Sequence, residues 1–406
     1  MSRKRILIVT ASPLCRNPRV LKEADTLGSA GFDVTVLTIA GRANDEAIDQ
    51  EILRDAPFKK IALPYFGFHG ALGLGAHASR TFTSLARRLV PLGIERRSAL
   101  GAFHRLHRVA RRIPADLIIA HTELGLAVGY ELLKRGRKVA VDIEDWHSQD
   151  LLPAAQTHRP LRLLQKNERF FLHNAVYVTT TSQAMAAALQ TAFGGKRPFA
   201  ITNSFPLQSD SASPKTNSHI PSFFWFSQTI GQGRGLESFL QAWSQTTAPS
   251  RLCLLGEIGA DYKHVLSELI PQEKQSHVSF LPPISPQLLP SAIAKHDIGL
   301  ALESKSPPSR NLTITNKILQ YLNAGLAIIA SSTAGHREVL QDNPQAGVFV
   351  DPANTTQFVS ILENLLVNSK NLVAMQMAAR ELAEQKYNWE KEAPALLTLV
   401  ESALAT

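Results

Sequence analysis

The segment Asn311–Gly325, NLTITNKILQYLNAG, is followed by LAIIASS and combines a polar loop, a short amphipathic helix and a buried strand. Residues of the type that caps helices precede the apolar positions: Asn311, Thr313, Thr315 and Asn316. The apolar positions share one helical face: Ile318, Leu319 and Leu322. Gly325 ends the helix, and residues 326–330 are predicted to form a buried strand.

Lys317 lies in the first turn of this helix, where a cation opposes the helix dipole. Its position is explained if an anion lies between the ammonium group and the free N–H groups of the helix start. A diphosphate needs such a combination of one cation and several backbone donors. The alternative is an ordinary capped surface helix with a solvated lysine, and both interpretations stay open on these residues alone.

The stretch NKILQYLNAGLAIIAS is similar to the donor-site helix of the retaining GT-B glycosyltransferases of family GT4. Three positions depart from the family pattern. Gln320 and Leu312 stand where glutamates are usual, and Ala327 stands where proline is usual. The resemblance implies an α/β protein of GT-B architecture, with two Rossmann-like parallel-sheet domains that face each other across a cleft.

The composition describes a globular protein that is long enough for two domains, with 406 residues, 44% hydrophobic content and 19% charged residues. The net charge of +9 favours anionic partners such as nucleotides, phosphates or membrane surfaces. Cys15 and Cys253 lie far apart in the sequence and indicate a reducing, cytoplasmic context. No apolar run approaches the roughly 20 residues of a membrane span, so any membrane role is expected to be peripheral.

The N-terminal half begins with a βαβ pattern: a strand at Arg5–Thr10, a helix from Pro18 and a strand at Val34–Thr38. The loop after the first strand lacks the GxGxxG of dinucleotide-binding enzymes, which argues against NAD or FAD. Because ligands bind at the carboxyl ends of parallel strands, Arg16 and Asn17 are candidates for contacting an acceptor. A capped helix with solvated arginines is the alternative.

Later strands in this half also end in polar residues. The predicted strand Asp116–His121 ends in His121 and is followed by Glu123, and Glu144, Asp145 and His147 follow the strand that begins at Val139. Loops on a rigid scaffold tend to carry chemistry, which favours a functional role for this group. A neutral histidine can accept a hydroxyl proton, and a carboxylate can orient an acceptor hydroxyl.

The resemblance assigns roles to these residues. His121 would face the reacting sugar, and His121 and Asp145 are the candidate catalytic residues. Glu144 stands where many relatives have a histidine. Contacts with the acceptor are expected from Arg16, Asn17, Glu123, Glu144 and His147.

The C-terminal half starts with an aromatic strand at Ser222–Ser227 and the glycine-rich segment QTIGQGRG. Glycines let the backbone approach a ligand closely, and Arg234 can supply a fixed charge. The resemblance implies that the donor diphosphate contacts Arg234 beside Gly233, Lys317, and the helix start at Thr315 and Asn316.

The remaining donor contacts also come from the resemblance. Gln320 would bind the ribose, and the backbone of Ile284 would hold the nucleotide base. Glu303 or Asn311 would touch the donor sugar in place of the missing glutamate. The resemblance implies no cofactor and no metal.

Residues 66–112 are rich in arginine, with Glu95 as the single acid. Two amphipathic helices with a solvated outer face are one interpretation. The other is a basic surface from Arg80 to Arg112 that binds anionic lipid or a lipid-phosphate acceptor. No nucleic-acid-binding motif is present, so nucleic acid is not an expected partner.

These patterns predict an N-terminal acceptor domain over residues 1–205, a linker over 206–221 and a donor domain over 222–385. A C-terminal helix over 386–406 is expected to cross back onto the first domain, as in relatives. The predicted function is transfer of a sugar, with retention of configuration, from a nucleoside diphosphate to a hydroxyl of a carbohydrate or lipid-linked acceptor. Such an activity would serve synthesis of cell-surface polysaccharide or glycolipid. The alternatives are a sugar-nucleotide epimerase and a non-catalytic sugar-nucleotide-binding protein.

Overall fold

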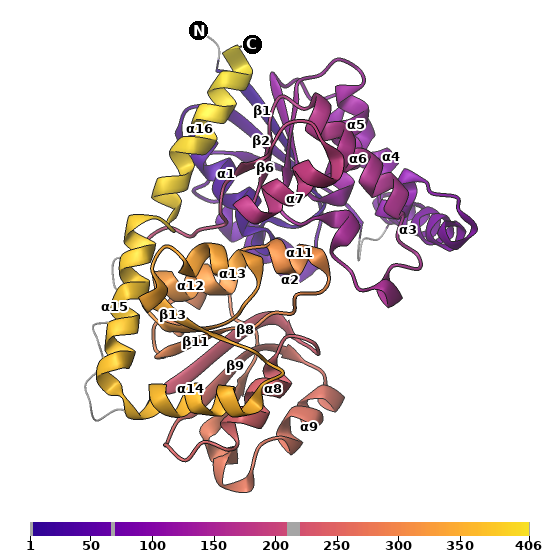
Figure 1. Cartoon of the computed structure of the whole chain (residues 1–406). Coiled ribbons are helices and arrows are strands. Elements are labelled where there is room, and N and C mark those ends of the chain that lie inside the picture. Colours follow the sequence, from indigo (N-terminus) through magenta and orange to yellow (C-terminus); the bar gives the residue numbers. More distant parts are fainter. Residues whose placement is uncertain (1–2, 66–69, 209–219, 406) are drawn as a thin grey trace. The chain divides into compact units, whose positions relative to one another are not determined.

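The computed structural model describes residues 3–65, 70–208 and 220–405, and most of the expected linker lies outside these residues. The chain divides into two compact units (Figure 1). Unit 1 comprises Met1–Ile201, Pro307–Ser309 and Ala393–Thr406, and unit 2 comprises Thr202–Ser306 and Arg310–Glu392. Each unit is described by itself.

Unit 1 is built on a seven-stranded parallel sheet with the order β3-β2-β1-β4-β5-β6-β7. Its strands are β1 (Arg5–Val9), β2 (Asp33–Ile39), β3 (Lys59–Leu63), β4 (Leu117–Ala120), β5 (Val139–Ile143), β6 (Val178–Thr180) and β7 (Phe199–Ala200). The central strands β1, β4 and β5 are short apolar runs that are buried after the first residue of β1, as expected of strands covered on both faces.

Helices connect these strands. They are α1 (Pro18–Ser29), α2 (Ala43–Ile52), α3 (Gly70–Leu89), α4 (Phe103–Ala110), α5 (Thr122–Leu133), α6 (Leu161–Asn174) and α7 (Gln183–Phe193). Short 3₁₀ helices lie between them: η1 (Leu14–Arg16), η2 (Val90–Leu92), η3 (Arg97–Leu100), η4 (His147–Gln149) and η5 (Pro153–Ala155). The strands run parallel because each connection is long enough to return the chain to the edge of the sheet where the previous strand began.

Unit 2 contains a six-stranded parallel sheet with the order β10-β9-β8-β11-β12-β13. Its strands are β8 (Ser222–Ile230), β9 (Arg251–Ile258), β10 (Val278–Leu281), β11 (Ile298–Ala301), β12 (Ala327–Ser331) and β13 (Gly347–Val350). The helices are α8 (Leu236–Trp243), α9 (Ala260–Glu268), α10 (Leu289–Ile293), α12 (Asn316–Asn323), α13 (Ala334–Leu340), α14 (Thr355–Val367) and α15 (Ser369–Gln385), with η6 (Gln272–His277) and η7 (Pro344–Ala346). Helix α11 (Pro308–Leu312) begins in unit 1 and ends in unit 2.

Alternate residues of β8 face two different hydrophobic cores in unit 2. Phe223 and Trp225 pack with α8 and α14, whereas Phe224 and Phe226 pack with α12, α13 and α15. Figure 1 shows α14 and α12 on opposite sides of this sheet. The two covered faces explain why the strands are continuous apolar runs.

Several elements differ from the sequence expectation. Strand β8 continues to Ile230, because the chain bulges after Phe226 and pairs again at Thr229, so part of the expected glycine-rich turn is strand. The arginine-rich region forms α3 and α4 with two 3₁₀ turns between them, and α2 and β3 were not predicted. Helix α16 (Trp389–Ala405) contains Pro394 and continues from unit 2 into unit 1. Within the described residues, no helix has the length and hydropathy of a membrane span.

Candidate active site

The carboxyl ends of β8 and β11 mark the point of unit 2 where the sheet order reverses. Open α/β sheets bind ligands at such a switch point, because the loops on either side run in opposite directions. The loop after β8 contains Gly233, Arg234 and Gly235, and Glu303 follows β11 closely. These loops therefore hold the candidate donor residues of unit 2.

Arg234 lies between two glycines in the left-handed region, Gly233 at φ 74° and Gly235 at φ 75°. A β-carbon on Gly235 would lie 3.0 Å from Cβ of Leu302, so the turn also needs a small residue. The Nη1 group of Arg234 donates to Oγ of Ser227 at 3.2 Å. The turn thus directs a fixed positive charge toward the end of β8.

Lys317 on α12 has a carboxylate as its counter-ion in this structure. Its Nζ lies 2.6 Å from Oε1 of Glu303, and the two side chains are 8% and 6% exposed. Burial acts to raise the pKa of Glu303, but Lys317 and then Arg234 outweigh it, and the pKa is lowered. The structure therefore brings Arg234, Lys317 and Glu303 into one electrostatic cluster. The alternative of a solvated lysine is therefore wrong, because Glu303 of the protein itself supplies an anion beside Lys317.

The start of α12 is held by a buried network. Oγ1 of Thr315 accepts the N–H of Ile318 at 3.5 Å and lies 3.0 Å from Nε2 of His336. His336 Nδ1 lies 3.0 Å from the carbonyl oxygen of Ser331, so Nδ1 carries the proton and Nε2 accepts from Thr315. Burial lowers the pKa of His336 to about 4, which keeps this ring neutral. The first-turn N–H groups of a helix have no acceptor within the helix, and Thr315 takes that of Ile318 here.

Of the other predicted donor residues of unit 2, two bind elements of the protein through their side chains and two are buried or packed against its core. Asn316 accepts from Asn203 Nδ2 at 2.8 Å, and Asn311 Oδ1 accepts the N–H of Ala334 at 3.1 Å. Gln320 is buried on α12, one turn after Lys317. Ile284 packs against the core on the α12 side. Asn311 thus supports the loop before α13 through its side-chain oxygen.

The switch point of unit 1 lies between β1 and β4, and His121 stands at the end of β4. The side chain is 1% exposed and its Nε2 lies 2.5 Å from Oε2 of Glu23 on α1. Burial acts against the charged ring, but Glu23 outweighs it and raises the pKa of His121. The sequence pattern predicts a neutral histidine that can accept a hydroxyl proton, whereas the structure buries His121 against a carboxylate.

A second buried ion pair lies beside this histidine. Arg19 on α1 and Asp142 on β5 approach to 2.6 Å and are 3% and 4% exposed. Arg19 Nη1 also donates to the carbonyl oxygen of Ile201 at 2.7 Å. The alternative interpretation, in which the arginines of this segment are solvated, is therefore wrong for Arg19, because the sheet end supplies a carboxylate and carbonyls around it.

The loop after β5 presents Glu144 and Asp145, with Glu144 half-buried and Asp145 exposed. Burial and the charge of Asp145 raise the pKa of Glu144 to about 7. Nearby His147 is buried, which together with Arg159 lowers its pKa to about 3. His147 is therefore neutral, and its carbonyl oxygen accepts from Arg159 at 2.8 Å.

Three side chains in this region could hold a metal ion by distance alone. Ligand atoms of Glu123, His147 and Asp150 lie within 4.8 Å of one another. However, an Arg159 Nη2 group lies 2.6 Å from Glu123 and 2.8 Å from Asp150. Burial raises the pKa of Asp150 to about 7 despite this arginine. The guanidinium group of Arg159 thus lies among these groups where a metal ion would otherwise bind.

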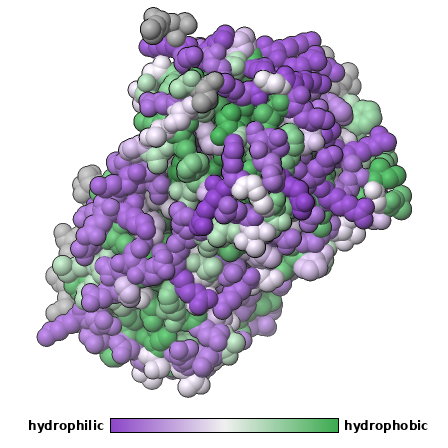
Figure 2. All heavy atoms as spheres, turned by 45° about the horizontal axis from the view of Figure 1, so that its top comes forward, coloured by the Kyte–Doolittle hydropathy of each residue, from purple (hydrophilic) through white to green (hydrophobic). Residues whose placement is uncertain are grey.

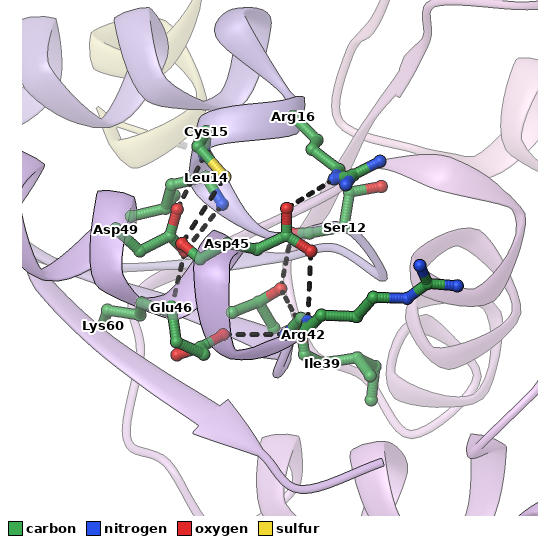
Figure 3. Close-up of polar contacts among 12 residues, drawn as sticks. Ser12, Leu14, Cys15, Arg16, Ile39, Arg42, Asp45, Glu46, Asp49 and Lys60 are labelled. Atoms are coloured by element: carbon green, nitrogen blue, oxygen red, sulfur yellow. Dashed lines mark hydrogen bonds and ion pairs between the residues drawn. The ribbon is translucent and has the colours of Figure 1, made fainter. Parts of the chain in front are cut away.

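The loop after β1 is anchored by α2 (Figure 3). Asp49 accepts the N–H groups of Leu14 at 3.0 Å and Cys15 at 2.8 Å, and Lys60 Nζ lies 2.6 Å from the same carboxylate. Asp45 accepts from Nε of Arg16 at 2.7 Å. Figure 3 shows the end of the Arg16 side chain directed away from Asp49 and Lys60. Arg16, half-exposed, is thus presented on a rigid loop.

Asn17, the other acceptor candidate of this loop, is buried and caps α1. Its Oδ1 accepts the N–H of Val20 at 3.1 Å. This is the capped helix that the sequence offered as an alternative.

Comparisons with known proteins identify both halves of the chain. A family model described as glycosyl transferases group 1 matches residues 221–368. A second model, described as a glycosyl transferase 4-like domain, matches residues 17–201. The chain belongs to the group 1 glycosyltransferases.

Solved structures confirm the predicted fold class for this glycosyltransferase. Sucrose-phosphate synthase from Thermosynechococcus elongatus matches with a TM-score of 0.70 and 16% identity over 99% of this chain and 100% of that chain. Anabaena HepE, solved with UDP and glucose, has a TM-score of 0.70 and 17% identity over 98% and 100% of the two chains. WaaG, a glycosyltransferase involved in lipopolysaccharide biosynthesis, has a TM-score of 0.62 and 12% identity over 97% and 99%. The chain thus has the GT-B fold.

Among curated proteins, spore coat protein SA of Bacillus subtilis is 23% identical to the glycosyltransferase over 128 residues. The match spans 32% of this chain and 33% of that relative.

Several residues that organise these sites were not predicted from the sequence: Glu23, Asp49, Arg159 and His336. Asp45 and Asp49 are four residues apart and so share one face of α2, which was a usable signal. Glu23 gave no such signal, because its partner His121 lies 98 residues away in the sequence.

Proposed function

We propose that this glycosyltransferase is a retaining enzyme of family GT4 that transfers a hexose from a nucleoside diphosphate to a hydroxyl. The observation that carries the proposal is the clustering of Arg234 and Lys317 around Glu303 at the switch point of unit 2. HepE, which has the same fold, was solved with UDP, so a uridine nucleotide is the first donor to test.

The leaving diphosphate would be stabilised by charges that are already in place. Arg234 and Lys317 supply two cations, and the first-turn N–H groups of α12 supply donors. Fixed charges stabilise a transition state well because they need little rearrangement when charge develops. This arrangement requires no metal ion. In the donor complex Lys317 would share its charge between Glu303 and the diphosphate.

Glu303 has a second role in this proposal. The two acidic positions of the family pattern hold Leu312 and Gln320 here. Glu303 follows β11 and its carboxylate has one oxygen on Lys317. The other oxygen can accept a hydrogen bond from a sugar hydroxyl. Gln320 would bind the ribose through its amide.

Unit 1 would bind the acceptor. Asp145 and Glu144 lie at the end of β5 and Arg16 lies on the anchored loop after β1, all at the carboxyl edge of the sheet. A carboxyl group with a pKa near 7, such as Glu144, can exchange a proton with a hydroxyl near neutral pH. The product would belong to a cell-surface polysaccharide or glycolipid.

The test is a screen of sugar nucleotides for thermal stabilisation, followed by product analysis with and without acceptors. A bound ligand at 100 times its Kd stabilises a protein by about 2.7 kcal/mol. Transfer to an added hydroxyl with retention supports the proposal. Donor conversion without an acceptor would identify an epimerase, and binding without turnover across many acceptors would identify a binding protein.

We also propose that an anionic membrane surface, on the cytoplasmic side, is a partner of unit 1. Apolar side chains in the second half of α3, at the end of η2 and shortly after it are exposed to solvent: Phe82 (65%), Leu85 (54%), Leu92 (72%) and Ile94 (44%). Figure 2 shows hydrophobic residues gathered at the right edge of the molecule, where Figure 1 places α3. Exposed arginines such as Arg88 and Arg96 lie among them. Next to Phe82, a hollow of about 650 Å³ is also lined by Arg96, Arg97 and Lys166. Apolar groups surrounded by cations are the chemistry that binds anionic lipid.

A further inference from the structure

We propose that Glu23 is a positioning residue that holds His121 by Nε2 and so leaves Nδ1 as the nitrogen that meets the substrate. The inference rests on the proposed sugar transfer and adds to it a residue outside the substrate contacts. Its basis is the 2.5 Å contact between Glu23 Oε2 and His121 Nε2, in which both side chains are buried. An ionised carboxylate only accepts hydrogen bonds, so Nε2 carries a proton in this pair.

The other ring nitrogen has no such partner. Within the described residues, His121 Nδ1 is buried and makes no hydrogen bond. An unsatisfied buried polar atom is destabilising and is uncommon in folded proteins. A substrate hydroxyl that donates to Nδ1 would remove this deficit, so the free nitrogen is the one available to the reaction.

The backbone next to His121 is held in an unfavourable conformation by the surrounding structure. Thr122 has φ 62°, and among the described residues it is the sole non-glycine residue with a positive φ. This conformation is especially unfavourable for a β-branched side chain. Its Oγ1 accepts the N–H of Ala11 at 3.1 Å, and His121 N–H donates to the carbonyl oxygen of Val9 at 2.8 Å. Strain of this kind concentrates at functional sites, where the surrounding structure enforces it.

The following helix α5 is pressed against the same strand. A β-carbon on Gly125 would lie 2.5 Å from the carbonyl oxygen of Val9. Residues 121–125 are therefore fixed to the end of β1, while Glu23 holds the ring from α1. Backbone and side chain are thus constrained independently, which is what precise orientation of a catalytic group requires.

Other charged groups also face this histidine. Glu23 and Asp142 both raise the pKa of His121, and Arg19 lowers it. The pKa of Glu144 also responds to these groups: Arg19 and His121 lower it, and Asp142 raises it. Because Arg19 and Asp142 are paired at 2.6 Å, Glu23 is the carboxylate that touches the ring itself. Replacing Glu23 therefore removes the direct partner and leaves the second ion pair in place.

The first test is nuclear magnetic resonance of the full-length protein with ¹⁵N-labelled histidine, with the His121→Gln variant used to assign the signal. The proposal expects the neutral ring to carry its proton on Nε2, and the titrating nitrogen to be Nδ1. In Glu23→Gln the amide can still accept from Nε2, but the loss of the negative charge should move the titration of His121 to lower pH. A proton on Nδ1 in the neutral wild-type ring, or an unchanged titration in the variant, would overturn the assignment. This readout does not depend on sugar transfer.

The second test is kinetic. Glu23→Ala should lower kcat by about tenfold or more, with less change in the KM for the donor, because the ring loses its orientation. Glu23→Gln should keep more activity and shift the acidic limb of the pH profile to lower pH. Asp116→Asn is the matched control, since it breaks the Arg5–Asp116 pair at the opposite ends of β1 and β4. Variants with wild-type kcat and pH profile would disprove the positioning role, whereas a wild type without transferase activity would refute the proposed function instead.

Discussion

At the scale of single residues, Lys317 shows how much of a functional prediction a local pattern can support. An anion near the ammonium group was one of two interpretations of its place in the first turn of a helix, and the structure supplies Glu303 at 2.6 Å. The buried pair is not by itself evidence of a stabilising role, since desolvation opposes the attraction. Its position at the sheet switch point, next to Arg234, is what connects it with a diphosphate.

Replacing either cation should impair turnover, and Lys317→Ala should also lower the free energy of unfolding because it leaves Glu303 buried without its partner. Lys317→Ala and Arg234→Ala are expected to reduce kcat by about a hundredfold, as with loss of one transition-state donor. Steady-state kinetics with the identified donor would measure this. Lys386→Ala is the control, because that lysine is 56% exposed and pairs with Asp342 on the same unit. Near-normal turnover in both site variants would remove them from the diphosphate site.

Glu303→Gln is expected to act differently. It leaves Lys317 buried without its carboxylate, which typically costs about 3–5 kcal/mol. The free energy of unfolding in urea should fall by this order. Pyrophosphate should stabilise the variant more than the wild type, because it replaces the missing anion. Equal stabilisation of both proteins would contradict the placement of the diphosphate beside Lys317.

His336 predicts a pH dependence of stability in unit 2. Its folded-state pKa of about 4 lies below the unfolded value, so the unfolded state binds more protons between these values. Stability is therefore lost as the pH falls from about 6.5 towards 4, by up to ~1.4 kcal/mol per unit. His336→Gln should remove this slope, so the stability difference between wild type and variant should shrink on acidification. Urea unfolding of both proteins at pH 7 and pH 5 would show it, and parallel losses would contradict it.

At the scale of elements, α2 acts as an anchor for the loop after β1. Asp49→Ala removes the acceptor of two backbone N–H groups and a partner of Lys60, whose side chain is 4% exposed. Hydrogen exchange at Leu14 and Cys15 should accelerate by tenfold or more, since ~1.4 kcal/mol corresponds to a factor of ten. Glu51→Ala is the control, because Glu51 is exposed on the same helix. Unchanged exchange in the Asp49 variant would show that the anchor is dispensable.

The elements themselves were largely predictable where apolar runs were bounded by capping and turn residues. Strand β1, helix α1 and the α12–β12 segment lie within a residue or two of their predicted ranges. The prediction failed for α2 and β3, because α2 carries many charged residues and β3 begins with two lysines. It also ended β8 too early, because a bulge is set by pairing with β9 and leaves no clear mark in the sequence.

At the scale of the whole molecule, the net charge of +9 favours anionic surfaces, and the proposed lipid contact can be tested directly. Vesicles with phosphatidylglycerol should bind the protein, and binding should weaken as salt rises. Each interfacial cation contributes around 1 kcal/mol, so the double change Arg88→Ala and Arg96→Ala should weaken binding by about 30-fold. Arg251→Ala, an exposed arginine of unit 2, is the control. Equal binding to neutral vesicles would contradict the proposal.

The order of apolar runs along the chain was enough to determine two parallel α/β domains, because burial on both faces leaves a continuous hydrophobic signature in each strand. The start of α12 could also be predicted from the sequence, since capping depends on residues only three or four positions apart. Only the tertiary structure decided which charges are paired. Glu23 with His121, Arg19 with Asp142, and Glu303 with Lys317 come from different elements, and the sheet brings them together at the ends of its strands. Electrostatic energy depends on the distance between charges and on their burial, and the spacing of residues along a chain determines neither of them.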